Sequence, residues 1–241
     1  MKNNSCEEIK YSVVVPIFNE QDTITLLYSC LKPVMDGLGE KYEAIFIDDG
    51  SNDSSLIRLN ALSQTHKNIR IIHFDSNRGQ GKAIEDGFKN AKGRIIITID
   101  GDLQNDPSDI PNLIAQINAG FDVVCGWRAG RSDTLFKKVK SKIGNFLQRK
   151  ITHLSLHDMS CTLRVYRKEM VMGIVFQGKF DFSMLPYIIS KRKQARIIEV
   201  RVKDNYRKFG KTKYKFFNTI FGTVCDYIRL VFLVKMPIRK K

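Results

Sequence analysis

The sequence lacks the paired-cysteine patterns that build disulfide frameworks and zinc sites. It has five cysteines, an odd number, and no Cys-x-x-Cys pair. Its four histidines show no metal-ligand spacing with these cysteines. We therefore expect free thiols in a reducing compartment and no zinc centre.

Two common phosphate-binding motifs are also missing. The glycines at 79, 81 and 87 do not form Gly-x-Gly-x-x-Gly, and Lys82 is followed by neither Ser nor Thr. Dinucleotide-binding and P-loop functions are therefore not indicated. Residues 1–10 are polar and the apolar run after them is only as long as a strand, so we expect no signal peptide.

Charge is distributed unevenly along a chain of ordinary globular composition. The 241 residues carry a net charge of +15, with −6 in residues 1–125 and +21 in residues 126–241. This asymmetry predicts metal and donor binding in the first half and an anionic partner for the second. Nucleic acid, a phosphorylated substrate and an anionic membrane surface are the alternatives for that partner.

Strand and helix patterns alternate through the first half, which predicts an α/β fold with a doubly wound, mostly parallel sheet. The expected strands are 11–17, 43–47, 69–74, 95–99 and 122–126, and the expected helices are 21–38, 52–66, 80–91 and 107–118. Farther on we expect strands at 162–166 and 195–202 and helices at 136–147, 168–176, 182–190 and 214–234.

The stretch RIIITIDGDLQNDP, residues 94–107, is the centre of this pattern. Its apolar run predicts a buried strand that ends at Asp100, Gly101 and Asp102. Two carboxylates at i and i+2 project to one side of an extended chain, and a hard divalent cation would neutralise them. Because ligands of open α/β sheets bind beyond the carboxyl ends of strands, this is a candidate metal site. The alternative is a loop with solvated Asp side chains.

The last predicted helix, 214–234, has a high apolar content interrupted by Asn218, Asp226 and Arg229. The interruptions argue against a spanning segment and favour an amphipathic helix in the membrane interface, flanked by basic residues. Such a cluster would hold the protein reversibly at an anionic leaflet. The alternative is a helix packed on the core with a solvated basic tail.

Six stretches occur in an order that resembles family 2 glycosyltransferases of the GT-A fold. They are VVVPIFNE (13–20), IDDGS (47–51), NRGQGKA (77–83), the run Asp100, Asp102, Gln104, DMSCTLRVYR (158–167) and RKFGKTKY (207–214). Within this family, the chain resembles the branch of dolichol-phosphate and polyprenyl-phosphate sugar synthases. It implies inverting transfer of a hexose from a nucleotide sugar, of the GDP-mannose or UDP-glucose type, to a polyprenyl or dolichyl phosphate.

The resemblance also implies roles for individual residues. Those expected to bind the nucleotide sugar are Pro16, Phe18, Asn19, Glu20, Asp48, Asp49, Gly79, Gly81, Lys82 and Asp100. Asp102 and Gln104 would bind Mg²⁺ or Mn²⁺, and Asp100, Asp102 and Arg164 form the catalytic set. The residues expected to bind the acceptor phosphate or the donor pyrophosphate are Arg128, Arg131, Arg164, Arg207 and Lys213.

The resemblance further implies an organisation and a location. Residues 1–213 would form the GT-A domain, with a nucleotide-sugar and metal half at 11–126 and an acceptor half at 127–213. Residues 214–241 would be a basic, amphipathic, membrane-associating segment. We expect a cytoplasmic enzyme at the inner face of the membrane, either associated peripherally or held by a membrane-anchored partner subunit.

Two positions depart from the family pattern. Trp127 stands before Arg128 where many relatives have a small residue, and Asp181 lies where lipid-phosphate enzymes often have basic or aromatic residues. Asp181 keeps open a saccharide-hydroxyl acceptor, which would need a carboxylate base. The ordinary alternative is a surface Asp.

Two functions of another class compete with an enzyme. The pI near 9.6 would suit a nucleic-acid-binding protein, but the basic half contains no recognised nucleic-acid module, so we expect no nucleic-acid partner. A non-catalytic adaptor that keeps the fold is the second alternative, and the intact Asp100, Asp102 and Gln104 set argues against it.

Overall fold

The computed structural model describes residues 8–129, 154–176 and 182–205. Its strands are β1 (Tyr11–Ile17), β2 (Tyr42–Asp48), β3 (Ile69–His73), β4 (Ile95–Thr98), β5 (Val123–Trp127), β6 (Arg164–Arg167) and β7 (Ile197–Arg201). Its helices are α1 (Ile24–Asp36), α2 (Ser55–Thr65), α3 (Gln80–Asn90), the 3₁₀ turn η1 (Pro107–Asp109), α4 (Ile110–Asn118), α6 (Lys168–Val171) and α7 (Leu185–Lys193).

The described strands form a single mixed sheet in the order β3-β2-β1-β4-β6-β5-β7. Strands β1, β2, β3 and β4 are parallel, and β5 pairs in parallel with β7. Strand β6 runs antiparallel to both of its neighbours, β4 and β5, and joins the two parallel groups. The predicted mostly parallel α/β sheet is therefore confirmed. The sequence did not predict that β6, in the interior of the sheet, is antiparallel to its neighbours.

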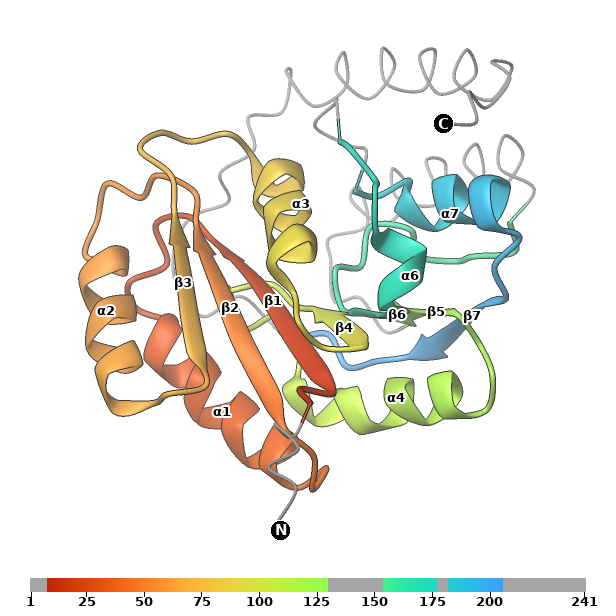
Figure 1. Cartoon of the computed structure of the whole chain (residues 1–241), viewed down its shortest axis with the longest axis horizontal. Coiled ribbons are helices and arrows are strands. Elements are labelled where there is room, and N and C mark those ends of the chain that lie inside the picture. The colour runs from red at the N-terminus through yellow and green to blue at the C-terminus, as the bar shows by residue number, and fades with distance from the viewer. Residues whose placement is uncertain (1–7, 130–153, 177–181, 206–241) are drawn as a thin grey trace, which may run out of the picture.

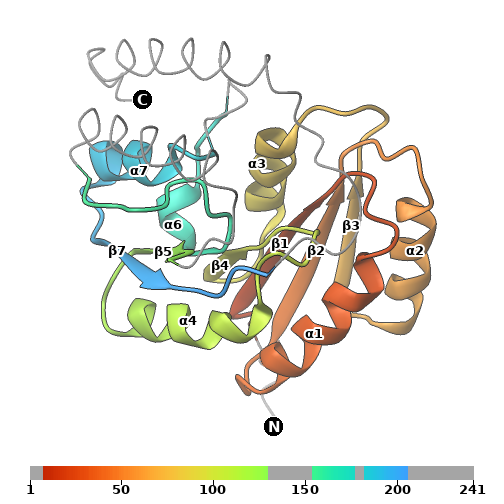
Figure 2. The ribbon, with the colours of Figure 1, turned by 180° about the vertical axis from the view of Figure 1, so that it is seen from behind.

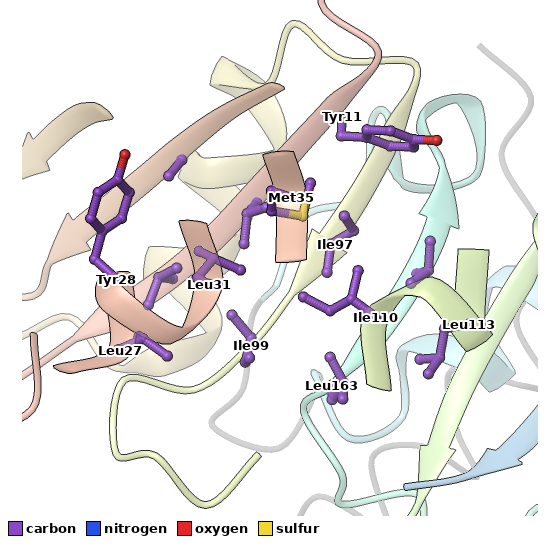
Figure 3. Close-up of a cluster of buried hydrophobic side chains, with 14 of the residues drawn as sticks. Tyr11, Leu27, Tyr28, Leu31, Met35, Ile97, Ile99, Ile110, Leu113 and Leu163 are labelled. Carbon is purple, nitrogen blue, oxygen red and sulfur yellow. The ribbon is translucent and has the colours of Figure 1, made fainter. Parts of the chain in front are cut away.

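Helices cover both faces of the sheet, as two opposite views show (Figures 1 and 2). Helices α1, α2 and α4 lie on one face, where their apolar side chains pack on alternate residues of β1, β2 and β4. Tyr11, Ile97 and Ile99 meet Met35 and Ile110 in this layer (Figure 3). Helix α3 packs on the other face together with α7 and the segment after α6. Burial of both faces explains why the strands read as continuous apolar runs.

Most element bounds agree with the sequence prediction within about three residues, which is normal for element ends. The exception is the helix expected at 168–176, which stops at Val171 as α6. Met172 has an extended conformation (ψ 133°) that ends the helix, and Gly173, with φ of +76°, completes a turn closed by Ile174 N and Val171 O at 3.3 Å. The helices expected at 136–147 and 214–234 lie outside the described residues.

Because β1, β2, β3 and β4 are parallel, their carboxyl ends share one edge of the sheet. The motif stretches that follow these four strands are therefore brought together there. The antiparallel β6 adds its preceding loop to the same edge, since Thr98 of β4 is paired with Arg164, the first residue of β6. This edge holds the candidate site.

Candidate active site

Asp100, two residues beyond β4, is held from both sides by side chains of other segments. Gln80, the first residue of α3, donates from Nε2 to Asp100 Oδ1 at 2.7 Å. Thr162 Oγ1 lies 2.5 Å from Asp100 Oδ2 and also 2.9 Å from the Asn105 side-chain oxygen. The carboxylate is thus fixed in direction by residues 20 and 62 positions away in the sequence.

Asp102 closes a tight turn beside it. Its Oδ1 accepts a hydrogen bond from the main-chain N of Gln104 at 3.1 Å, and Leu103 between them has φ of +63°. Gly101 is required for close packing, because a Cβ there would lie 2.5 Å from Ile17 Cδ1. The two carboxylates therefore occupy a turn that packs directly against the end of β1.

The charge of Asp102 opposes the ionisation of Asp100. Burial raises the pKa of Asp100 to about 7, and the neighbouring charge of Asp102 adds to the rise, as does Glu20 more weakly. The Thr162 hydrogen bond and the charge of Arg128 act in the opposite direction. Two carboxylates this close in sequence favour a bound cation, because its positive charge would offset the repulsion between them.

The stretch after β1 is clamped to the start of α2. Asn19 has φ of +52°, donates from its main-chain N to Ser51 Oγ at 2.9 Å, and accepts from Asn52 N at 2.7 Å. The main-chain N of Glu20 donates to Ser55 Oγ at 2.9 Å. These contacts hold two of the predicted nucleotide-binding residues at the shared edge, and the other two of this stretch, Pro16 and Phe18, are partly buried there.

Asp48 and Asp49 are both buried and both engaged with the protein. Asp48 Oδ2 lies 2.8 Å from His73 Nδ1, at the end of the neighbouring strand β3. Asp49 accepts hydrogen bonds from the main-chain N of Arg78 at 2.6 Å and of Gly79 at 2.9 Å. Burial raises the pKa of Asp49, and these two amides counteract that rise. The observed contacts of Asp49 fix the loop that leads into α3.

That loop ends at Gly79, whose φ of +91° is readily adopted only by glycine. Gly79 precedes the first residue of α3, and Gly81 is buried in the first turn of that helix. Lys82 is directed to a protein partner, because its Nζ donates to Glu85 Oε1 at 2.7 Å. Lys89 Nζ contacts the same oxygen at 2.5 Å.

Arg128, the residue after β5, forms a bidentate pair with Asp158. Its Nε lies 2.8 Å from Asp158 Oδ2 and one of its Nη atoms lies 3.1 Å from Oδ1, while the same Nη donates to Ser160 Oγ at 3.0 Å. Burial opposes the charge of Arg128, but Asp158 more than offsets it and raises the guanidinium pKa. Arg128 therefore holds the 158–160 loop beside the site.

Arg164 is completely buried and bonded to main-chain carbonyls. Its Nη atoms donate to Met159 O and, at 2.8 Å, to Phe182 O, and its guanidinium lies 4.7 Å from the centre of the Phe182 ring. No surface of this side chain is exposed. Its contacts join the loop before β6 to the segment before α7, whereas the family resemblance implied a contact with phosphate.

The remaining predicted phosphate-binding residues are outside the described residues: Arg131, Arg207 and Lys213. Asp181, the candidate base for a hydroxyl acceptor, is outside them as well. Their assignments stay predictions.

Trp127 is the centre of a polar-aromatic cluster at the end of β5. Its ring stacks on His157 with centroids 4.4 Å apart, and the Arg201 guanidinium lies 5.0 Å from its centre. Glu199 accepts from His157 N at 2.7 Å and lies 2.9 Å from His157 Nδ1. The residue that departs from the family pattern is thus packed beside the 158–160 loop that Arg128 holds.

Three residues of the site were missed by sequence reasoning: Gln80, Asn105 and Thr162. Gln80 and Thr162 lie within the recognised stretches NRGQGKA and DMSCTLRVYR, but nothing local indicates that both point at Asp100. Asn105, which is nearly fully buried, follows Gln104 directly. Only the three-dimensional fold reveals these contacts.

In the described ranges no group of three or more His, Cys, Asp or Glu side chains surrounds a common point. Asp100, Asp102 and the neighbouring Gln104 place carboxylate and amide groups within one five-residue stretch. In the same part of the chain, Cys30, Cys125 and Cys161 are free thiols, as expected. No helix in that part is long and apolar enough to cross a membrane.

Residues 12–174 match glycosyl transferase family 2. The chain is 32% identical over 240 residues to dodecaprenyl-phosphate galacturonate synthase of Rhizobium johnstonii, covering 98% of this chain and 71% of that protein. It is 39% identical over 218 residues to undecaprenyl-phosphate 4-deoxy-4-formamido-L-arabinose transferase of Photorhabdus laumondii, covering 90% and 66%. The chain thus spans about two thirds of the length of these curated relatives.

Solved structures show the same fold at lower sequence identity. Glucosyl-3-phosphoglycerate synthase of Mycobacterium tuberculosis in complex with UDP superposes with a TM-score of 0.72 at 21% identity, covering 96% of this chain and 82% of that one. The same enzyme with Mn²⁺, UDP-glucose and phosphoglyceric acid gives a TM-score of 0.69 at 19% identity, covering 96% and 81%.

An α/β sheet with paired carboxylates at the carboxyl edge of its parallel strands is the arrangement of a GT-A-like transferase. The chain belongs to glycosyl transferase family 2. Its curated relatives are polyprenyl-phosphate sugar transferases, so the resemblance predicted from the sequence is confirmed.

Proposed function

We propose that this protein transfers a sugar from a nucleoside-diphosphate sugar to a polyprenyl phosphate. One observation carries the proposal: Asp100 and Asp102 are held together at the carboxyl edge of the sheet, in a family 2 chain whose relatives are named for that reaction. The transferred sugar is a hexose in our sequence-based prediction, from a GDP-mannose or UDP-glucose type donor.

A divalent cation, Mg²⁺ or Mn²⁺, fits the residues present. Asp102 and Gln104 supply oxygen atoms in one turn, and Asp100 supports them with a carboxylate whose pKa is raised to about 7 by burial and by Asp102. Oxygen ligands of this kind suit hard cations. The donor diphosphate would supply further oxygen ligands. When bound, the cation would stabilise the negative charge that develops on the leaving nucleotide.

The residues at the shared edge would hold the donor. The donor would contact residues in or directly after β1, namely Pro16, Phe18, Asn19 and Glu20. It would also contact Asp48, which ends β2, and Asp49, which follows it. Gly79 and Gly81 allow the backbone to come close to phosphate or sugar. Lys82 would reach a donor phosphate by leaving Glu85, whose charge Lys89 continues to neutralise.

The acceptor needs no general base. A phosphate monoester has its second pKa near about 6, so it is largely dianionic at pH 7 and is already a nucleophile. Its oxygen would attack the anomeric carbon as the nucleoside diphosphate departs, which inverts the configuration. The protein's contribution is position: Arg131, Arg207 and Lys213 are proposed to bind the acceptor phosphate, while Arg128 and Arg164 hold the loops beside it.

The acceptor chemistry also suggests where the enzyme works. A lipid phosphate lies in a membrane, and residues 214–241 carry the basic, amphipathic pattern of an interfacial segment. We propose peripheral association with the cytoplasmic membrane face, alone or with a membrane-anchored partner subunit.

A transfer assay tests this function directly. Purified full-length protein is incubated with polyprenyl phosphate, Mn²⁺ or Mg²⁺, and one labelled donor at a time: GDP-mannose, UDP-glucose, UDP-galacturonate or a UDP-N-acetylhexosamine. We expect label in the organic phase with one donor class. Donor binding without lipid labelling would overturn the lipid acceptor and favour a saccharide hydroxyl with Asp181 as base. No donor binding would overturn the transferase function and favour an adaptor.

A further inference from the structure

Thr162 lies in the recognised stretch DMSCTLRVYR but has no role in the function described above. We propose that Thr162 is a positioning residue that, together with Gln80, fixes the Asp100 carboxylate in the direction needed by the donor and its cation. The proposal rests on the proposed transferase function and concerns how its central carboxylate is oriented.

The two oxygens of Asp100 are occupied symmetrically. Gln80 Nε2 donates to Oδ1 at 2.7 Å, and the Thr162 hydroxyl lies 2.5 Å from Oδ2. A carboxylate oxygen accepts about two hydrogen bonds, so each oxygen keeps one lone pair for a ligand. Rotation about the Cβ–Cγ bond would break both contacts. The pair therefore sets the plane of the carboxylate without using up its binding capacity.

The Thr162 hydroxyl has one proton and two oxygen neighbours, Asp100 Oδ2 and Asn105 Oδ1. It can donate to only one of them. With the Asn105 amide turned by 180°, its nitrogen donates to the Thr162 hydroxyl, which is then able to donate to Asp100. The Cys161 thiol lies 3.9 Å both from the other amide atom and from Leu163 O, so it can donate to either of these oxygens.

The resulting chain runs in one direction, from the Asn105 amide to Thr162 and from Thr162 to Asp100. Hydrogen bonds in such a chain polarise one another, so the final bond to the carboxylate is strengthened. Asn105 is nearly fully buried, and the main-chain oxygen of Thr162 accepts from Thr98 Oγ1 at 2.6 Å. The Thr162 hydroxyl, which donates to Asp100, is thereby anchored on the rigid sheet, as a preorganised site requires.

The simpler interpretation is that Thr162 only satisfies buried polar groups. The two interpretations differ in what they change. A residue that only stabilises the fold alters the free energy of unfolding, whereas a positioning residue alters cation affinity and turnover in a protein that stays folded. The test therefore measures all three.

The variants are Thr162→Val, which keeps the shape but loses the hydroxyl, and Thr162→Ser, which keeps the hydroxyl. Mn²⁺ binding is measured by electron paramagnetic resonance, with Mn²⁺ alone and with Mn²⁺ plus UDP or GDP. Turnover is measured in the lipid transfer assay. We expect Thr162→Val to weaken Mn²⁺ binding and to lower kcat by about 10- to 100-fold each, the effect typical of losing a supporting residue of a metal site. The KM for polyprenyl phosphate should not change, and Thr162→Ser should restore most of both losses.

Two further variants complete the design. Tyr187→Phe on α7 also removes a buried hydroxyl, one without a hydrogen-bond partner among the described residues, and it should leave Mn²⁺ affinity and kcat unchanged. Gln80→Leu removes the other donor from a partly exposed position, so it tests the proposal even where Thr162→Val fails to fold.

Wild-type Mn²⁺ affinity and kcat in both Thr162→Val and Gln80→Leu would overturn the positioning role. A wild-type protein that neither binds Mn²⁺ with nucleotide nor transfers sugar would instead overturn the proposed function. The two failures are therefore distinguishable.

Discussion

Glu85 of α3 accepts a hydrogen bond from the main-chain N of Phe176 at 2.8 Å, across 91 positions of sequence. The same carboxylate is bonded to Lys82 and Lys89 and is 1% exposed. Glu85 thereby joins α3, whose first turn carries predicted donor-binding residues, to the segment after α6.

We expect Glu85→Ala to destabilise the protein by about 1–3 kcal/mol, because it leaves the buried Phe176 N–H without an acceptor. The two lysines are partly exposed, so water can solvate them after the change. Urea unfolding measures the effect. Glu169→Ala, at an exposed position on α6, is the matched control and should change the free energy of unfolding little. Equal effects from the two variants would contradict the role of Glu85.

The same carboxylate should make stability depend on pH. Burial alone would raise the pKa of Glu85, but the hydrogen bonds from Lys82, Lys89 and Phe176 outweigh it, so the pKa lies below its ordinary 4.5. A lowered folded-state pKa stabilises the protein above the unfolded-state value and loses that contribution as pH falls through the folded value. The difference in unfolding free energy between wild type and Glu85→Gln should therefore shrink below about pH 4.5. A difference that stays constant down to pH 3 would exclude this linkage.

Asp102→Ala should abolish transfer without unfolding the protein. The side chain hydrogen-bonds within its own turn and is only partly buried, whereas a cation contributes several kcal/mol to the departure of the nucleotide. Because each ~1.4 kcal/mol is tenfold in rate, kcat should fall by at least about 100-fold. Asp22→Ala, at an exposed position before α1, should transfer at the wild-type rate. Unchanged turnover in Asp102→Ala would refute the metal assignment.

Removing the cation should have the same effect as removing its ligand. We expect a chelator to stop transfer and added Mn²⁺ or Mg²⁺ to restore it, with circular dichroism unchanged throughout. We expect the cation to bind more tightly with nucleotide present, because the diphosphate would add oxygen ligands. Full activity after exhaustive chelation would argue for a metal-independent enzyme.

Gly101 and Ile17 should show coupled effects on stability. A Cβ at 101 would lie 2.5 Å from Ile17 Cδ1, so Gly101→Ala should cost about 1–3 kcal/mol by overpacking. Ile17→Val removes that methyl group and alone should cost about 1 kcal/mol. The double variant should be more stable than the sum of the single effects predicts, which a double-mutant cycle by urea unfolding measures. Strict additivity would show that the clash is relieved elsewhere.

The strands could be located from sequence because each is a short apolar run closed by turn residues. The runs from Tyr11 to Ile17 and from Ile95 to Ile99 correspond to β1 and β4 almost residue for residue. The place of β6 between β4 and β5 could not be found this way. Pairing depends on contacts between distant segments, and no local pattern in RVYR indicates an antiparallel neighbour.

The site was predictable where its chemistry is local. That Asp100 and Asp102 lie in one turn was predictable from their spacing, whereas the contact of Asp100 with Thr162 was not, because it spans 62 positions. Arg164 shows a second limit of prediction from sequence, because the residue was identified but its contacts were not. A charged residue beside a strand is usually directed to solvent or ligand, but here the carbonyls of Met159 and Phe182 need donors in the interior, and Arg164 supplies them.

The antiparallel strand β6 has a consequence for synthesis on the ribosome. Strand β5 leaves the ribosome before β6, yet β6 lies between β4 and β5 in the finished sheet. Until residue 167 has emerged, β4 exposes an unpaired edge and β5 has neither of its final neighbours. Asp100, in the turn after β4, therefore cannot form its contact with Thr162 until that residue has been synthesised. At this stage of synthesis the unpaired strand edges are those that a chaperone would be expected to bind.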